Sequence, residues 1–383
     1  MKKLKILEIT AFSAGICGVW ARVLAESKLL AEKGQEIHVF SSNIFRGEEP
    51  KKAKSFEIID NVKVHRFPAF FNFGQNTFFW NFKKKALELK PDLIITHAYR
   101  QYYSTIALKI AKRLGIPCIL VTHAPFLEKK LRKWKLNAAV FIYDNFIGRR
   151  IINQYSKIIA ITKWEYPYLF ALGAERKNIW YIPNGIPNEF LKIKIRKPRN
   201  KIKKILFLGR VAPIKDIETL IKAFSIVKKQ YPEVELDFVG PAEKEYLGKI
   251  EGLIKKLNVK LNFIGPIYNL GKKIKIIDLA DIFVLPSKRE AMPQALIEAM
   301  ARKKLVISSK TDGGKEIIED GKTGLLFDIG NEIQFADKIL FVLNQKNSKK
   351  IDKIKKNAFE HIKQFSWSEI IKKINGVIDE VIE

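Results

Sequence analysis

Two glutamates, Glu290 and Glu298, lie in a stretch that is otherwise rich in small and apolar residues, SKREAMPQALIEAM (287–300). Carboxylates are rarely buried unless a partner neutralises them. The preceding run ADIFVLPS (280–287) is apolar and closed by a proline, which favours a strand buried on both faces of a parallel sheet. Pro293 is typical of the first turn of a helix. We therefore expect Glu290 in the loop after the strand and Glu298 in the second helical turn, at the sheet edge where ligands bind.

Two basic residues occupy a second loop of the same kind, in LFLGRVAPIKDIETLIKAF (206–224). Arg210 directly follows an apolar run, and Lys215 precedes a helix-like segment. Two cations beside the free N–H groups of a helix N-terminus favour the binding of a diphosphate. In a lysine-rich chain such a pair on its own is more often a solvated face than a site. The second helix start, with its two carboxylates at the same sheet edge, favours a ligand site.

The elements that must position these residues form a repeating pattern. Apolar strand-like runs alternate with amphipathic stretches, which is typical of βαβ units and parallel sheets. The pattern restarts after a basic, proline-containing connector at 196–210, which separates a first series (1–184) from a second (185–364). The last stretch, 365–383, has the spacing of one amphipathic helix. The sequence thus predicts an α/β protein with two doubly wound domains in tandem.

Composition narrows the class of protein. With 383 residues, 47% hydrophobic and 11% aromatic, the chain can form two domains with full cores. Only Cys17 and Cys118 are available for disulfides, so we expect a reducing compartment. We expect neither a signal peptide nor a spanning helix. The formal net charge of +30 favours an anionic partner, which can be phosphate, nucleic acid or an acidic membrane, although drift toward lysine is an alternative.

Several ordered motifs together resemble a known family. The spacing of Glu290 and Glu298, the segment GRVAPIKDIETLIKAF (209–224) and TDGGKEIIEDGKTGLLF (311–327) are similar to the retaining nucleotide-sugar glycosyltransferases of the glycosyltransferase 4 family. The resemblance covers most of the chain. It implies the GT-B fold, in which two Rossmann-like domains face each other across a cleft. Residues 1–184 would bind the acceptor and be completed by the helix 365–383, while 185–364 would bind the nucleotide sugar.

The resemblance also implies roles for individual residues of the second domain. Arg210 and Lys215 would hold the diphosphate of the sugar donor and neutralise charge on the departing nucleotide, and Glu298 would accept hydrogen bonds from the ribose hydroxyls. The hydroxyls of the transferred sugar would contact Glu290 and the backbone of Ala291, Met292 and Pro293. The family usually has glycine where this chain has Ala291.

In the first domain the resemblance implicates two loops. His123 ends the strand-like run before APF, where the family often has a histidine near the reacting sugar; a structural role is the alternative. His97 also ends a strand, and its role stays open. Gly18 would allow close approach of phosphate or acceptor, although Cys17 stands where the family usually has a second glycine.

Two further stretches of the first domain, 67–85 and 125–150, interleave aromatic and basic residues. In the second stretch an apolar face at helical spacing is expected beside a basic remainder, which suits a membrane interface. An ordinary surface helix packed on the core is the alternative, and the Phe-rich first stretch favours the membrane. The apolar face comprises Leu127, Leu131, Trp134, Ala138 and Phe141. The basic residues are Lys129, Lys130, Arg132, Lys133 and Lys135.

The sequence therefore predicts a retaining, metal-independent hexosyltransferase without a cofactor. It would move mannose, glucose or N-acetylhexosamine from a GDP- or UDP-linked sugar to a hydroxyl of a glycolipid or lipid-linked glycan, forming an α-glycosidic bond at the inner face of the cell membrane. No Asp-x-Asp pair, Cys/His cluster or Walker loop is present. A glycoside hydrolase, which needs two carboxylates flanking the scissile bond, and a basic nucleic-acid-binding protein are the alternatives.

Overall fold

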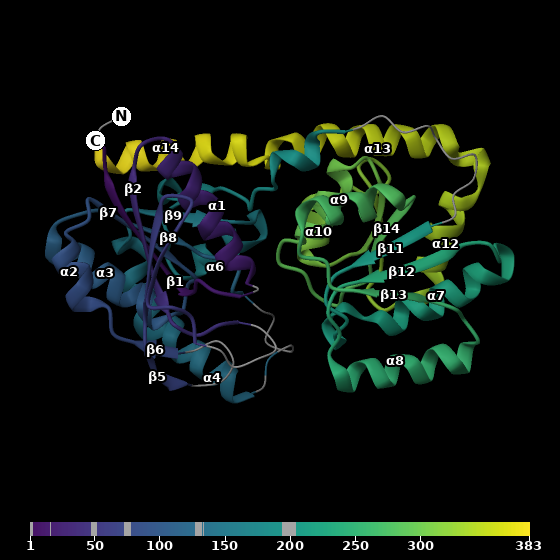
Figure 1. The fold of residues 1–383 in the computed structure, drawn as a ribbon, viewed down its shortest axis with the longest axis horizontal. Coiled ribbons are helices and arrows are strands. Elements are labelled where there is room, and N and C mark those ends of the chain that lie inside the picture. The colour runs from purple at the N-terminus through teal and green to yellow at the C-terminus, as the bar shows by residue number, and fades with distance from the viewer. Residues whose placement is uncertain are drawn as a thin grey trace. The chain divides into compact units, whose positions relative to one another are not determined.

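The computed structural model of the chain describes residues 3–15, 17–46, 52–72, 78–126, 132, 134–193 and 204–383. The chain forms two compact units (Figure 1). Unit 1 comprises Met1–Gly185 with Trp367–Glu383, and unit 2 comprises Ile186–Ser366. Each unit has a parallel-rich sheet between layers of helices, so the predicted α/β class with two Rossmann-like sheets is confirmed.

Unit 1 is built on an eight-stranded sheet with the order β10-β9-β8-β7-β1-β2-β4-β3. All neighbouring strands are parallel except β3 and β4, which pair antiparallel. The chain moves outward from β1 through β2, then returns to β7 and moves the other way, so the topological switch point lies between β1 and β7. The strands are β1 (Lys5–Phe12), β2 (Glu36–Ser42), β3 (Phe56–Ile59), β4 (Val62–Phe67), β7 (Leu93–His97), β8 (Cys118–Val121), β9 (Lys157–Ala160) and β10 (Ile179–Tyr181).

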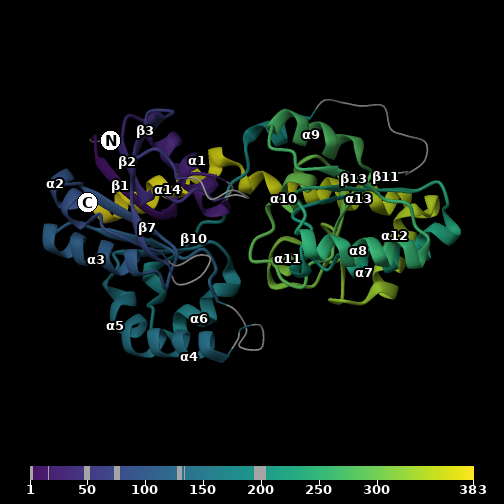
Figure 2. The same ribbon diagram turned by 60° about the horizontal axis from the view of Figure 1, so that its bottom comes forward.

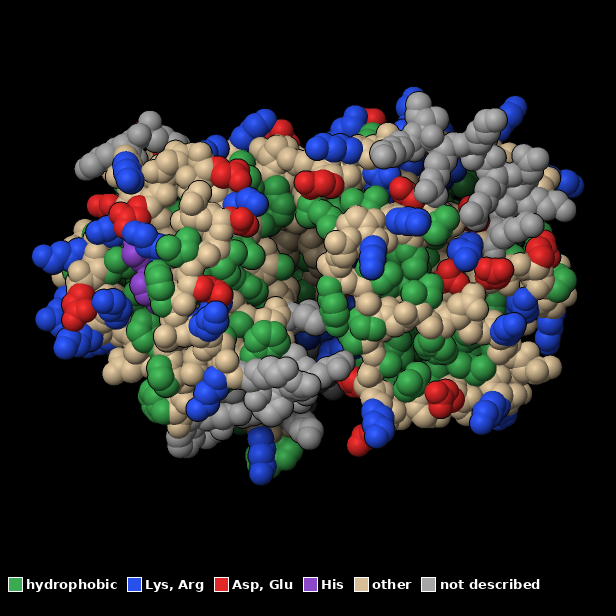
Figure 3. Space-filling view, in the orientation of Figure 1, with side chains coloured by type: hydrophobic (Ala, Val, Ile, Leu, Met, Phe, Trp, Pro, Cys, Tyr) green, Lys and Arg blue, Asp and Glu red, His purple; other side chains and the backbone are tan. Residues whose placement is uncertain are grey.

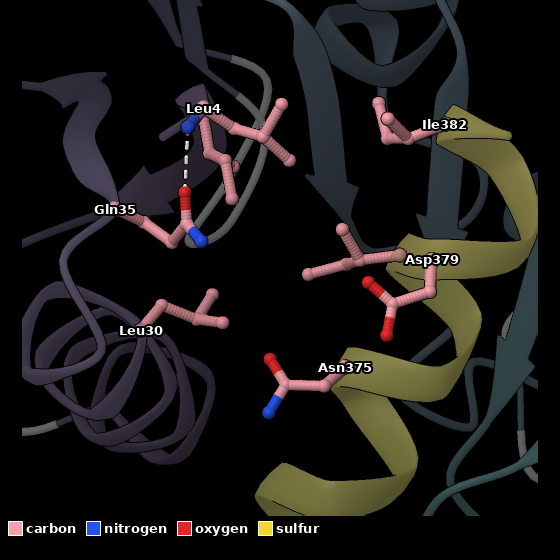
Figure 4. Close-up of a pocket in the computed structure, with 8 residues that line it drawn as sticks. Leu4, Leu30, Gln35, Asn375, Asp379 and Ile382 are labelled. Carbon is pink, nitrogen blue, oxygen red and sulfur yellow. Dashed lines mark hydrogen bonds between the residues drawn. The ribbon is translucent and has the colours of Figure 1, made fainter. Parts of the chain in front are cut away.

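The helices of unit 1 cover both faces of this sheet. Alternate residues of β1 point to opposite faces. Leu7 joins the core under α2 (Lys83–Leu89) and α3 (Tyr102–Leu114), and these two helices lie next to each other in Figure 2. Ile6 lines a small cavity with α1 (Gly18–Glu32) and α14 (Trp367–Ile382), where Leu30 and Asn375 approach each other from the two helices (Figure 4). The predicted C-terminal helix is confirmed, and its buried isoleucines attach it to unit 1.

Unit 2 is built on a six-stranded, fully parallel sheet with the order β13-β12-β11-β14-β15-β16. Its switch point lies between β11 and β14. The strands are β11 (Lys204–Leu208), β12 (Glu235–Val239), β13 (Asn262–Gly265), β14 (Ile282–Leu285), β15 (Leu305–Ser309) and β16 (Leu325–Phe327). On one face α7 (Ile217–Gln230) packs between α8 (Lys244–Leu257) and α12 (Glu332–Leu343). The other face carries α9 (Leu270–Leu279), α10 (Gln294–Ala301) and α13 (Ser348–Ile362) (Figure 1).

The stretch with the two glutamates folds nearly as predicted. All residues of β14 are buried, because this central strand has a neighbour on each side and helices on both faces. Glu290 lies in the loop after β14, and Glu298 lies in the second turn of α10. The helix begins one residue later than predicted, because Pro293 is its N-cap and does not stand in the first turn.

The helix predicted within 125–150 is present in the described residues from 134 on, but its predicted amphipathic character is wrong. These residues form α4 (Trp134–Ile142), the π-helical segment η2 (Tyr143–Gly148) and α5 (Arg149–Ile151). No residue of α4 is buried, whereas Tyr143 packs against the core and Gly148 is buried, so the alternative of a helix packed on the core holds only after α4. Its apolar side chains point in several directions, because the adjacent Phe141 and Ile142 are both exposed. Leu127, Lys129, Lys130, Leu131 and Lys133 lie outside the described residues.

The Phe-rich stretch 67–85, which favoured the membrane interpretation, is partly buried where the structure describes it. It contributes strands β5 (Ala69–Asn72) and β6 (Phe78–Trp80), which pair antiparallel. Trp80 and Phe82 are buried in the core beside α3, where their rings lie 4.5 Å apart. Phe70 is exposed. No helix in the described part of the chain combines the length and apolar character that crossing a bilayer requires.

Candidate active site

The basic and acidic candidates of unit 2 flank its switch point. Arg210 and Lys215 follow β11, Glu290 follows β14, and these two strands are neighbours. The Nζ atom of Lys215 lies 2.5 Å from Oε1 of Glu290, and the hydroxyl of Ser287 donates to the same oxygen at 2.5 Å. The side chain of Lys215 is only 21% exposed and that of Glu290 only 11%. The structure thus pairs the first glutamate with the nearest candidate cation, at the edge where parallel sheets bind ligands.

The loops that carry this pair are held by backbone hydrogen bonds. The amide of Lys288 donates to the carbonyl of Ile214 at 2.9 Å, which links the loop after β14 to the loop after β11. The amide of Gly313, in α11 (Asp312–Ile317), donates to the carbonyl of Glu290 at 3.0 Å. A Cβ atom at Gly313 would lie 2.6 Å from the carbonyl oxygen of Ala291. The TDGG motif therefore lets α11 begin directly against the Glu290 loop.

The other two candidates have different partners. Glu298 is buried and forms an ion pair with Lys273 of α9 at 2.5 Å. Burial raises the pKa of Glu298, and the charge of Lys273 opposes that rise. Arg210 is mostly exposed, and its Nη1 lies 2.9 Å from Glu243. Both opening glutamates are therefore paired with a lysine, as the burial argument requires.

The remaining predicted residues of this site occupy the loop before α10. Met292 and Pro293 are buried and Ala291 is half-buried. Lys273 and Glu243 were missed by sequence reasoning. Lys273 lies in the lysine-rich run GKKIKII, where no local signal distinguishes one lysine from its neighbours.

In unit 1, His97 and His123 come together with a carboxylate that sequence reasoning missed. His97 Nδ1 lies 3.0 Å from His123 Nε2, and His97 Nε2 lies 3.0 Å from Oε2 of Glu8. The hydroxyl of Ser27 donates to Oε1 of Glu8 at 2.7 Å. Glu8 and His97 are fully buried, whereas His123 is partly exposed. His97 and His123 could be selected from the sequence because each ends a strand-like run. Glu8 lies in the middle of a strand, where no local motif marks it as a site residue.

The loop of His123 has an unusual backbone. His123 and Ala124 have φ angles of 58° and 50°, the left-handed region that non-glycine residues seldom adopt and that occurs at functional sites. Glu165 supports this loop, because its carboxylate accepts hydrogen bonds from the amides of Ala124 and Thr162, each at 3.0 Å. Burial raises the pKa of Glu165 to about 7 against the opposing hydrogen bonds. The position of His123 is therefore determined by a buried carboxylate from the next βα connection.

Gly18 is the exposed first residue of α1. A Cβ atom there would meet no described protein atom within 4 Å, so packing within the protein does not require this glycine. Cys17 precedes the helix as its N-cap, and its sulfur accepts a hydrogen bond from Arg46 at 3.3 Å. The glycine leaves open space at the N-terminus of a helix, where anions are favoured.

Basic side chains are spread over the visible face in Figure 3, with acidic and apolar ones between them. Among the described residues, no group of three His, Cys, Asp or Glu side chains is placed to hold a metal ion. Of the predicted membrane residues, Trp134 is 75% exposed, and Lys135 Nζ lies 5.7 Å from the centre of its ring.

Comparison with known proteins agrees with this arrangement. The family model for Glycosyltransferase Family 4 matches residues 16–190, and the model for Glycosyl transferases group 1 matches residues 189–361. An uncharacterized glycosyltransferase of Methanocaldococcus jannaschii is 28% identical over 100% of both chains. GalNAc-alpha-(1->4)-GalNAc-alpha-(1->3)-diNAcBac-PP-undecaprenol alpha-1,4-N-acetyl-D-galactosaminyltransferase of Campylobacter jejuni is 25% identical over 88% of each chain. Phosphatidyl-myo-inositol mannosyltransferase of Mycobacterium leprae is 26% identical over 62% of this chain and 60% of that protein.

Solved structures share the fold at low identity. Anabaena HepE in complex with UDP and glucose has a TM-score of 0.75 and 19% identity, covering 98% of this chain and 100% of that chain. A glycosyltransferase from Rickettsia africae has a TM-score of 0.79 and 17% identity, covering 100% of both chains. With both family models matched in order and two Rossmann-like sheets in place, the chain belongs to the glycosyltransferase 4 type of glycosyltransferases with the GT-B fold.

Proposed function

We propose that this glycosyltransferase is a retaining, metal-independent hexosyltransferase that uses a nucleoside-diphosphate sugar and glycosylates a glycolipid or lipid-linked glycan through an α-glycosidic bond. The observation that carries the proposal is the Lys215–Glu290 pair at the switch point of unit 2, with Arg210 in the same loop. This is the sheet position at which doubly wound proteins bind nucleotides.

This site has partners for both the charged diphosphate and the polar hydroxyls of a sugar donor. The ammonium of Lys215 has three N–H donors, so it can contact a diphosphate oxygen while keeping one hydrogen bond to Glu290. The second oxygen of Glu290 can then accept a hydrogen bond from a hydroxyl of the sugar. The exposed Arg210 can leave Glu243 and bind the diphosphate, since a surface ion pair contributes only about 0–1 kcal/mol.

Catalysis would come from positioning and electrostatics. Negative charge grows on the diphosphate as the glycosidic bond breaks, and fixed cations at that point stabilise the transition state more than the ground state. Arg210 and Lys215 would supply this charge in place of a metal ion. The solved complexes of Anabaena HepE with UDP and with UDP-glucose support a nucleotide-sugar donor for this fold.

The names of two relatives support the class of acceptor. One includes an undecaprenol diphosphate and the other a phosphatidylinositol. In unit 1, the apolar residues Trp134, Phe141 and Phe146 are exposed, and the same segment carries the exposed Lys135 and Arg149. Aromatic side chains with neighbouring cations suit an anionic membrane surface, and we propose that the segment 134–150 binds the inner face of the cell membrane, where a lipid-linked acceptor is reached.

The donor assignment is tested by nucleotide binding. Calorimetry with UDP, GDP and their sugars should identify a ligand, and Glu298→Ala should weaken its binding because an acceptor for the ribose hydroxyls is lost. A hydrogen bond to a charged group contributes about 1.5–3 kcal/mol, which corresponds to a loss of roughly 10–150-fold. Glu319→Ala, which removes an exposed carboxylate paired with Lys322, is the matched control. Unchanged affinity in folded Glu298→Ala would refute the ribose assignment.

The membrane assignment is tested by sedimentation with liposomes. The protein should bind anionic vesicles, bind neutral ones weakly, and be partly released at high salt as the Debye length falls. Phe141→Ser with Phe146→Ser should reduce binding, whereas Ile333→Ser, an equally exposed change in α12, should not. Equal binding of all three proteins would remove the segment 134–150 from the proposal.

A further inference from the structure

A buried hydrogen-bonded chain crosses the switch point of unit 1 and ends at His123. It runs from Ser27 of α1 through Glu8 of β1 and His97 of β7 to Nε2 of His123, with separations of 2.7, 3.0 and 3.0 Å. Glu8 and His97 are fully buried. The other ring nitrogen of His123, Nδ1, has no hydrogen-bond partner within the part of the chain that the structure describes, and His123 is partly exposed. These hydrogen bonds therefore connect the buried carboxyl of Glu8 to His123, whose Nδ1 is available to a ligand.

We propose that Glu8 and His97 are positioning residues that set the tautomer of His123, so that its Nδ1 faces the substrate as an N–H donor and becomes an acceptor when the chain loses one proton. The contact between His123 and substrate rests on the proposed function. The coupling of the three side chains rests only on their geometry.

Each group in the chain can donate in only one direction at a time. If the carboxyl of Glu8 is protonated, it donates to Nε2 of His97, because Ser27 already donates to its other oxygen. His97 must then carry its proton on Nδ1 and donate to Nε2 of His123. A neutral His123 consequently carries its own proton on Nδ1, where it can donate to a sugar hydroxyl or phosphate oxygen.

Removal of one proton reverses all of these hydrogen bonds. Nδ1 of the partly exposed His123 releases its proton to solvent, the proton of His97 Nδ1 moves to His123 Nε2, and the proton of Glu8 moves to His97 Nε2. Glu8 is then a carboxylate that accepts from Ser27 and His97, both histidines remain neutral, and His123 Nδ1 is an acceptor. The step balances with a single proton lost from the chain.

The surroundings favour the protonated form at neutral pH. Burial raises the pKa of Glu8 to about 8, against the opposing effects of the Ser27 hydrogen bond and the charge of Arg22. Burial lowers the pKa of His97 to about 4, with Glu26 raising it and Arg22 lowering it. The charged groups around the chain are Arg22 and Glu26 of α1, which pair with each other at 3.3 Å, and Glu165 beside the His123 loop.

The variant Glu8→Gln separates the two arrangements. Its amide N–H₂ can donate to His97 Nε2, and its amide oxygen can accept from Ser27, so it keeps both hydrogen bonds. It cannot ionise, however, and therefore holds His123 in the tautomer with the proton on Nδ1. The less invasive Ser27→Ala removes only the hydrogen bond that lowers the pKa of Glu8. That variant should move the switch to higher pH.

The experiment is ¹⁵N nuclear magnetic resonance of the histidine rings in the full chain, from about pH 6 to about pH 10. The chain has five histidines, so His97 and His123 can be assigned by substitution, and His38, His65 and His361 serve as internal references. In the wild type, Nδ1 of His123 should change from the protonated to the unprotonated signal near the pKa of Glu8. The change should be absent in Glu8→Gln and shifted upward in Ser27→Ala.

Two results would overturn the proposal: a His123 tautomer that does not change in the wild type, or one that changes equally in Glu8→Gln. If Glu8→Gln does not fold, the shift in Ser27→Ala decides. Activity separates this inference from the proposed function. With the nucleotide sugar selected by calorimetry, kcat/KM should fall about tenfold or more across the switch in the wild type and stay level in Glu8→Gln. A tautomer switch without that fall would refute the contact of His123 with substrate and leave the coupling intact.

Discussion

Gly313 offers a direct test of how the glutamate loop is positioned. A Cβ atom there would lie 2.6 Å from the carbonyl oxygen of Ala291 and 2.8 Å from the carbonyl oxygen of Glu290. Both contacts are with backbone, which cannot rotate away as a side chain can. In Gly313→Ala the loop must therefore retreat by about half an ångström in a close-packed interior. The displacement moves Glu290 relative to Lys215.

The expected cost follows from two opposing effects. Overpacking typically costs about 1–3 kcal/mol, while alanine in place of glycine inside a helix stabilises by up to about 1 kcal/mol. The clash exceeds the gain, so unit 2 should lose about 1–2 kcal/mol and its Tm should fall by roughly 2–8 °C. Binding of the sugar donor should weaken by at least about tenfold, because the Lys215–Glu290 geometry is lost.

Calorimetric unfolding and titration with the selected nucleotide measure both effects. Gly252→Ala is the matched control, because that glycine is exposed in α8 and its new methyl group would meet no atom within 4 Å. The control should be more stable than the wild type by about 0.5–1 kcal/mol and bind normally. A Gly313→Ala protein with wild-type Tm and affinity would show that the loop yields freely and that this packing argument is wrong.

Three further outcomes are expected. Arg210→Ala should lower kcat more than it raises the KM for the sugar donor without changing stability, whereas Lys215→Ala should also destabilise unit 2, because Glu290 loses its cation; a pure KM effect would contradict the role in catalysis. Burial lowers the pKa of His65 to about 4 from 6.5, so this ring binds fewer protons in the folded state than in the unfolded state. The wild type should therefore lose up to about 1.4 kcal/mol of unfolding free energy per pH unit relative to His65→Phe as the pH falls from about 6.5 to about 4; denaturant titrations with equal slopes for the two proteins would refute this. Activity should persist in excess chelator, and a strict need for Mg²⁺ or Mn²⁺ would exclude the metal-independent mechanism.

Local sequence was sufficient for the layout of unit 2. The apolar run that became β14 is continuous because the strand is buried on both faces, and the residues after Pro293 are mostly strong helix formers, which form α10. Glu290 was therefore assigned to a loop and Glu298 to a helix from their neighbours alone. The prediction for the segment 125–150 also rested on local sequence alone, and there its amphipathic face was wrong. Its spacing was read as one apolar face, but spacing cannot tell whether another element lies beneath that face, and here none buries α4.

The sequence by itself thus determined the alternation of strands and helices, the family and the loops in which candidates lie. Only the tertiary structure decided which side chains meet. Glu8 and His97 are 89 positions apart, and Lys215 and Glu290 are 75 apart, yet each pair is in contact because the parallel sheet makes neighbours of strands that are distant in the chain. A local pattern indicates the kind of element to which a residue belongs. Its partner depends on strand order, which is the outcome of packing over the whole unit.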